Sequence, residues 1–154
     1  MIYVVSEAAT KAKALLSYMN QIQLRLRART PMGIYMQLRD TLKEGEHYAG
    51  VILGKGGEPD HHLILLPGDA ADVGWPGALE WTASQGGELP NRRELSLLFA
   101  NLREQFEREW YWSSEPHETR SQLVWGENFA SGIQTVYGRP FRGHTRAVRR
   151  VLIE

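Results

Sequence analysis

The chain has 154 residues, of which 42% are hydrophobic and 10% aromatic, enough for a single domain with a sizeable core. Eighteen basic residues balance eighteen acidic ones, and zero formal charge disfavours general nucleic-acid binding, which goes with a basic domain. The chain has no cysteine, so disulfides, thiolate metal sites and cysteine nucleophiles are excluded, and a reducing compartment is the natural setting.

The N-terminal segment MIYVVSEAATKAKALL has no basic stretch ahead of a long apolar run, so it does not resemble a secretory signal. No apolar run approaches the roughly 18–20 residues that a membrane-spanning helix needs. We therefore expect no membrane span, and a protein that is made and kept in the cytosol or packaged from there.

The first predicted element is one long amphipathic helix over residues 6–29, with Ser6 as its N-cap and Pro31 ending it. Four apolar residues form one stripe at spacings of four, three and four: Leu15, Met19, Ile22 and Leu26. Basic residues crowd the rest of the helix: Lys11, Lys13, Arg25, Arg27 and Arg29. The basic face is either solvated or binds a partner or a membrane surface. The apolar stripe predicts a homo-oligomer, or attachment to a larger assembly.

Residues 32–44 give a mixed signal. Ile34, Met36 and Leu38 alternate as in a strand, whereas Leu38 and Leu42 are one helical turn apart. We expect a short strand followed by a helical turn. Residues 1–45 are then an N-terminal helical extension, and residues 46–154 are the folded domain.

A β-hairpin and two helices follow. The runs HYAGVILGK and HHLILLPG flank the turn sequence GGEPD, which predicts the hairpin. Pro76 and the pair Gly86-Gly87 mark the ends of a helix over 75–86. Asn91 and Glu94 predict a capping box at the start of a helix over 91–106. The core stripe of this second helix is Leu95, Leu98, Phe99 and Leu102.

From Trp110 onward the sequence predicts short strands separated by loops. WYWSSE, LVWGENF, GIQTVYG and RAVRRVLI are β-rich runs without helical periodicity. The last run predicts a strand whose arginines pair with acids on its exposed face, with contact to phosphate or nucleic acid as the alternative. Its arginines are Arg146, Arg149 and Arg150. The order of elements indicates an α+β domain and not a parallel doubly wound sheet.

Several motifs occur together in a fixed order: HLILLPG, ALEWTASQGGELPNRRELSLLFANL, YWSSE, VWGENFASGIQ and RAVRR. In these motifs, over about residues 47–152, the chain resembles the Lcl C-terminal-like domain family, a former domain of unknown function common in bacterial and prophage proteins. The resemblance implies a C-type-lectin-like fold with short antiparallel strands and two helices. It also implies a ligand-binding module, often oligomeric, and related folds display the diversified surfaces of phage receptor-binding proteins.

Two activities of lectin-like relatives do not carry over to this chain. One relative generates formylglycine with cysteine chemistry, and this chain has no cysteine. The calcium signature of sugar-binding lectins is not matched, because the EPD run at Glu58–Asp60 lies in the hairpin and WGEN replaces the second half of the signature. We expect no catalytic residue, no cofactor and no bound metal. Adjacent His61 and His62 should point to opposite faces of a strand and so cannot share one ion easily.

The segment LVWGENFASGIQT is predicted to be a framework and not itself the site. Trp125 and Phe129 would pack under a surface loop, Asn128 would hold a turn, and Gly126 and Gly132 would allow positive φ. Four further tryptophans are assigned to the core: Trp75, Trp81, Trp110 and Trp112.

The predicted binding residues lie in two flanking segments, Ser114–Gln122 and Gln134–Arg146. Tyrosine and arginine commonly anchor interfaces, and glycines and a proline suggest that Gln134–His144 is an exposed loop. The candidate residues are His117, Arg120, Gln134, Tyr137, Arg139, Phe141, Arg142 and His144.

Two functions fit these features. The first is a non-enzymatic phage or prophage module that binds a protein or a surface glycan, either in the cytosol or within a phage particle. The second is a cytosolic phage accessory factor that binds and inhibits a host defence protein.

Overall fold

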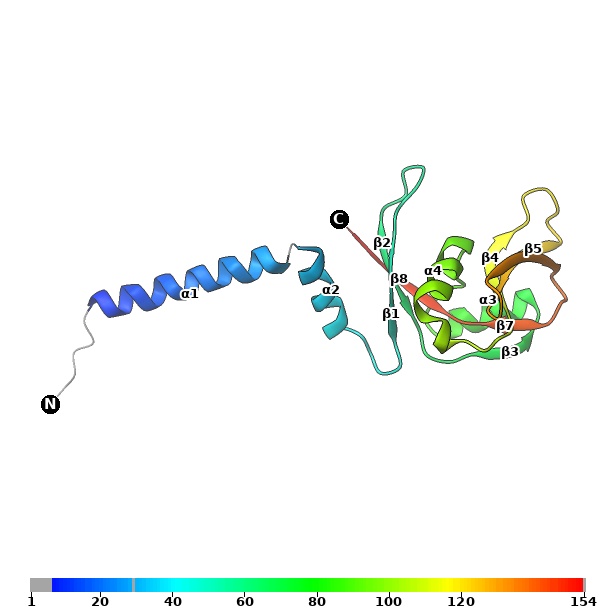
Figure 1. Cartoon of the computed structure of the whole chain (residues 1–154), viewed down its shortest axis with the longest axis horizontal. Coiled ribbons are helices and arrows are strands. Elements are labelled where there is room, and N and C mark those ends of the chain that lie inside the picture. The colour runs from blue at the N-terminus through cyan, green and yellow to red at the C-terminus, as the bar shows by residue number, and fades with distance from the viewer. Residues whose placement is uncertain (1–6, 29, 154) are drawn as a thin grey trace. The chain divides into compact units, whose positions relative to one another are not determined.

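The computed structural model describes residues 7–28 and 30–153 (Figure 1). Its contacts divide the chain into two compact units, residues 1–42 and 43–154. Over the described residues the fold is mixed α+β, with four α-helices and two sheets of three and five strands. No helix within the described ranges is long and apolar enough to cross a bilayer.

The first unit contains two helices. Helix α1 spans Glu7–Ala28 and agrees with the predicted long helix, whereas the proposed cap Ser6 lies outside the described residues. Helix α2 spans Pro31–Asp40, so the prediction of a strand here is wrong. The reason is local: the Thr30 side chain accepts a hydrogen bond from the Gly33 amide at 3.0 Å, and proline is well tolerated in the first helical turn.

The second unit begins with the predicted hairpin. Strands β1 (His47–Ile52) and β2 (His61–Leu65) pair antiparallel, and β8 (Val148–Leu152) pairs with the other edge of β2. The first sheet therefore has the order β1-β2-β8, and it holds the first and the last strand of the domain.

The second sheet has the order β3-β7-β4-β5-β6. Its strands, in chain order, are β3 (Ala70–Val73), β4 (Trp110–Pro116), β5 (Leu123–Asn128), β6 (Ile133–Gly138) and β7 (Gly143–Thr145). All its pairs are antiparallel except β4 with β7, which run parallel. In Figure 1 the orange and red C-terminal segment runs from β7 in this sheet to β8 in the other, so it ties the two sheets together.

Two helices pack on these sheets where the sequence predicts them. Helix α3 spans Trp75–Ser84, and α4 spans Arg92–Leu102, continued by a short 3-10 helix η1 (Arg103–Gln105). The predicted capping box is confirmed, because the Asn91 side chain accepts from the Glu94 amide and the Glu94 carboxylate accepts from the Asn91 amide. Residues 110–153 contain no helix, as the sequence indicates.

The core has two adjoining clusters. One joins α4 to both sheets and contains Leu63, Leu65, Leu95, Leu98, Tyr111, Phe129 and Val148. The other lies beside α3 and contains Trp75, Ala78, Leu89, Trp112 and Val124. Trp110 is also buried and Trp81 is partly buried, which places the predicted tryptophans in or beside the core.

The framework segment behaves as predicted in most respects. Phe129 is fully buried, Asn128 Oδ1 accepts from the Ala130 amide at 2.8 Å, and Gly132 has a φ of +76°. Gly126, however, is not at positive φ, so the predicted reason for this glycine is wrong. A Cβ there would lie 2.3 Å from the Tyr111 carbonyl oxygen and 2.4 Å from the Trp110 ring, so close packing requires glycine.

Candidate ligand-binding surface

The predicted loop from Gln134 to His144 is not one loop. Gln134 and Tyr137 belong to β6, which pairs with β5 along its whole length, and His144 belongs to β7. Only residues 139–142 connect the two strands. The prediction is therefore wrong at both ends of the segment, because strand pairing outweighs the loop-like composition.

The strand geometry separates the candidate residues onto two faces. Gln134 and Tyr137 are three positions apart on β6, so their side chains point to opposite faces of the sheet. Gln134 Nε2 donates to the Arg92 carbonyl oxygen at 2.8 Å, and Gln134 Oε1 accepts from Arg92 Nε at 2.9 Å. Gln134 therefore faces α4 and is held within the domain.

A buried carboxylate lies beside Gln134. Glu127 is only 1% exposed, and its Oε2 accepts from Gln134 Nε2 at 2.8 Å. Burial raises the pKa of Glu127, while the hydrogen bonds from Gln134 and Ser96 act in the opposite direction. A shallow pocket of about 260 Å³ opens here and is lined by Arg92, Arg93, Ser96, Glu115 and Gln134. These side chains mostly bond to one another, which favours a role in joining α4 to β5 and β6.

The opposite face carries a pair of exposed aromatic rings. Tyr137 is 40% exposed and Phe141 is 38% exposed, and their rings stack with centroids 4.2 Å apart. Beneath them, Tyr137 meets the Trp110 ring edge-on, and Phe141 meets Trp112 in the same manner. The core tryptophans thus hold the two outer rings in place at the surface.

Two arginines belong to the same segment: Arg139 lies between the two aromatic residues in the sequence, and Arg142 follows Phe141. The Arg139 guanidinium lies over the Trp75 ring at 4.5 Å, and its Nε donates to the Ser121 carbonyl oxygen at 2.9 Å. Arg142 Nε donates to Asp72 at 2.9 Å, and the Arg142 side chain is 62% exposed. We call Tyr137, Arg139, Phe141 and Arg142 the aromatic patch. It combines flat apolar surface with cationic donors, the composition typical of interface anchors.

The second predicted segment adjoins the patch through the backbone. The Arg139 amide donates to the Gln122 carbonyl oxygen at 3.1 Å, so the loop between β4 and β5 meets the loop between β6 and β7. In the first of these loops, Arg120 is exposed and its Nη2 lies 3.4 Å from His117 Nε2. His117 stacks on Trp125 and is largely covered, so Arg120 is the more accessible of the two.

His144 belongs to a separate cluster. Its Nδ1 lies 2.9 Å from Asp69 Oδ1, and the Tyr111 hydroxyl donates to the other Asp69 oxygen at 2.5 Å. Burial, together with the bond to Asp69, raises the pKa of Tyr111 above its ordinary value. These contacts join β7 and β4 to the start of β3. They give His144 a role in the packing of the second sheet.

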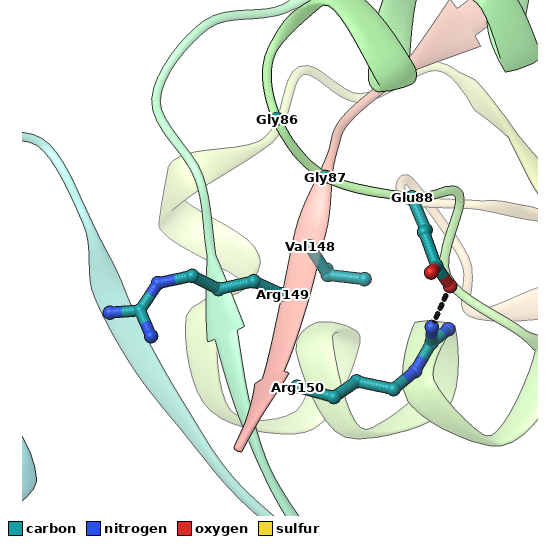
Figure 2. A pocket seen from close by; sticks show the side chains of 6 residues that line it. All are labelled: Gly86, Gly87, Glu88, Val148, Arg149 and Arg150. Atoms are coloured by element: carbon teal, nitrogen blue, oxygen red, sulfur yellow. Dashed lines mark hydrogen bonds and ion pairs between the residues drawn. The ribbon is translucent and has the colours of Figure 1, made fainter.

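The C-terminal arginines line another cavity, of about 280 Å³, where Gly86, Gly87 and Glu88 pass β8. Figure 2 shows Arg149 and Arg150 on opposite sides of β8, with Arg150 directed toward Glu88. Arg149 binds Glu46 with two hydrogen bonds, and Arg150 also binds Glu94. The expected pairing with acids is therefore confirmed for these two arginines. The expected exposed face is wrong for two of the acids, because the Glu46 and Glu94 side chains are 4% and 0% exposed.

Arg146 departs from that pattern. It is 8% exposed, and it donates to the Gln105 and Leu66 carbonyl oxygens and not to a carboxylate. Close packing requires glycine at position 87, because a Cβ there would lie 2.6 Å from Leu66 Cδ1. Of the residues that line the cavity, Gly87, Arg149 and Arg150 are thus held by contacts within the domain.

The two adjacent histidines have different partners, as strand alternation predicts. His61 Nε2 lies 2.8 Å from Glu94 Oε1, whereas His62 Nδ1 lies 3.0 Å from the Tyr48 hydroxyl. Across the part of the chain that the structure describes, no group of three or more metal-binding side chains is found.

Sequence reasoning missed the residues that support the patch. Trp75 and Asp72 lie in or beside β3 and α3, far from Arg139 and Arg142 in sequence. The spacing of residues in neither segment indicates that these side chains come into contact.

No protein-family model and no curated protein matches the chain.

Proposed function

We propose that the second unit is a non-enzymatic ligand-binding module with a C-type-lectin-like fold, encoded by a phage or prophage. It recognises a protein or a surface glycan through the aromatic patch. The observation that carries this proposal is the stacked Tyr137–Phe141 pair, with both rings about 40% exposed and with Arg139 and Arg142 in the same short segment.

The arrangement of the domain supports the lectin-like assignment. The motifs that carry the resemblance fall on successive elements, from the hairpin through α3 and α4 to β4, β5 and β8. The first and last strands of the domain flank β2 in one sheet. The loops of the last third project from the second sheet, where related folds display their binding surfaces.

The chemistry of the patch suits recognition. An aromatic pair that is already held in place loses little conformational entropy when a partner covers it. An exposed guanidinium can bind carboxylate or phosphate groups in two-pronged geometry, and such groups occur on acidic glycans and on proteins. The ion pair of Arg142 with Asp72 is exposed on both sides, so a ligand anion can replace Asp72 at small cost.

The test is binding of the purified full chain to intact bacteria, to an array of bacterial surface glycans and to soluble bacterial lysate in parallel. Arg142→Ala should weaken capture by about 30-fold, the loss of a typical anchor of about 2 kcal/mol. Arg108→Ala removes another exposed arginine of the same domain and serves as the matched control.

Equal binding by Arg142→Ala and the parent chain would contradict the assignment of the patch. Capture of a soluble protein alone, with no binding to cells or glycans, would favour the second function, an intracellular inhibitor of a host protein.

A further inference from the structure

Helix α1 exposes a row of large apolar side chains. Leu15 is 64% exposed, Met19 55% and Ile22 39%. Leu16 and Tyr18, on either side of this row, are also exposed by more than 60%. A 22-residue helix gains little stability on its own, and most helices in proteins depend on packing of an apolar face. The row therefore needs a partner surface.

The spacing of the row identifies the kind of partner. Small and large apolar residues follow one another at steps of four, three, four, three and four: Ala8, Ala12, Leu15, Met19, Ile22 and Leu26. This alternation is the a and d pattern of a coiled coil. Thr10 and Ser17 fall on the outer side in this register, although Leu24 departs from the pattern.

We propose that α1 pairs with α1 of a second copy of this chain as a parallel coiled coil, with Leu15, Met19 and Ile22 at the seam. This inference does not depend on the ligand of the aromatic patch. Because α1 precedes the folded domain in the chain, a parallel pair carries both domains at the same end of the helices. Two linked modules bind a multivalent surface more tightly than one.

Charge favours the parallel arrangement. An antiparallel pair that aligns the same apolar layers sets position 11, a lysine, beside position 25 of the partner, an arginine, at both ends. A parallel pair in register instead sets Lys11 beside Leu16 of the partner subunit.

A membrane-surface helix is less consistent with the sequence. Such helices carry lysine and arginine along the polar face, and the middle of this one has Ser17, Asn20 and Gln21.

The first test measures the mass of the full chain by sedimentation equilibrium over a range of concentrations. The parent chain should show twice the mass of one chain, and Leu15→Glu should reduce it to that of one chain. Ser17→Glu adds the same charge to the same helix on its outer side and should leave the mass unchanged. A single-chain mass for the parent, or equal effects of the two substitutions, would overturn the proposal.

The second test uses the absence of cysteine in the natural sequence. In a parallel pair, position 12 faces its counterpart closely enough for a disulfide, so Ala12→Cys should cross-link on mild oxidation. Ser17→Cys should not. An oligomer in which Ala12→Cys fails to cross-link would overturn the parallel register. A monomer that sediments with anionic phospholipid vesicles would assign the apolar row to a membrane and likewise overturn the proposal.

Discussion

Replacement of Glu94 by glutamine should destabilise the domain strongly. The Glu94 side chain is fully buried, and its Oε1 lies 2.6 Å from Arg150 Nε and 2.8 Å from His61 Nε2. Its Oε2 accepts from the Asn91 amide and from Arg150 Nη2, both at 2.8 Å. One carboxylate thus joins the start of α4 to β2 and β8.

The magnitude follows from burial. Removing one partner of a buried ion pair costs about 3–5 kcal/mol when the remaining charge is left desolvated. Arg150 is 25% exposed and keeps its ion pair with Glu88, so we expect a loss of about 3 kcal/mol, at the lower end of this range. Glu88→Gln is the matched control, since Glu88 binds the same Arg150 but its side chain is 73% exposed. An exposed pair contributes about 0–1 kcal/mol.

Urea unfolding at neutral pH, followed by tryptophan fluorescence, measures both losses. The midpoint should fall far more for Glu94→Gln than for Glu88→Gln, with similar slopes. Equal losses would show that burial does not decide the strength of this ion pair.

The pH dependence provides a second check on the same residue. Burial acts to raise the pKa of Glu94, but the hydrogen bonds and charge of Arg150, with the Asn91 amide, lower it overall. An acid whose pKa is lowered by folding stabilises the fold above its unfolded pKa of about 4.3, and this stability is lost as pH falls through the folded value. The difference between the parent and Glu94→Gln should therefore shrink in acid.

Three further predictions concern single residues. Gly126→Ala forces a Cβ to within 2.3 Å of the Tyr111 carbonyl oxygen and should cost about 1–3 kcal/mol or more in urea unfolding. Gly138→Ala on the next strand, where the nearest atom is 3.7 Å away, should cost much less, and equal costs would contradict the packing argument. Glu127→Gln should raise stability relative to the parent above about pH 4.3, since burial raises the pKa of Glu127 and its charged form opposes folding. A constant difference from pH 3 to 8 would contradict this assignment. Arg142→Ala should leave the melting temperature nearly unchanged, because its ion pair is exposed, and a drop of many degrees would show that it is structural.

Local signals in the sequence are sufficient to predict most of the helices and strands. The capping residues Asn91 and Glu94 fix the start of α4, and the turn between β1 and β2 follows from its glycines and proline. The segment 31–40 forms a helix although Ile34, Met36 and Leu38 alternate as in a strand, because Thr30 caps the helix and Pro31 is tolerated in its first turn.

The surface could be predicted only in part. Tyrosine and arginine content pointed to the segment that contains Tyr137 and Phe141, but composition does not report the face of a strand. The sequence therefore predicts Gln134 as a member of the same surface, whereas Gln134 faces α4. The partners of Arg139 and Arg142 are distant in the sequence. Contacts of this kind depend on the order of strands in the sheet, which local sequence patterns do not predict. Tyr137 also packs on Trp110, so truncating it would affect stability as well as binding.

If the aromatic patch is the binding surface, a bound ligand should slow hydrogen–deuterium exchange there in the full chain. Exchange should be compared with and without the glycan or protein that the binding screens select. We predict slower exchange of backbone amides in 137–142 and in the adjoining 118–122. The hairpin tip at 53–58 and the turn at 130–132 should be unaffected. Protection at either of those turns, with none at 137–142, would contradict the account.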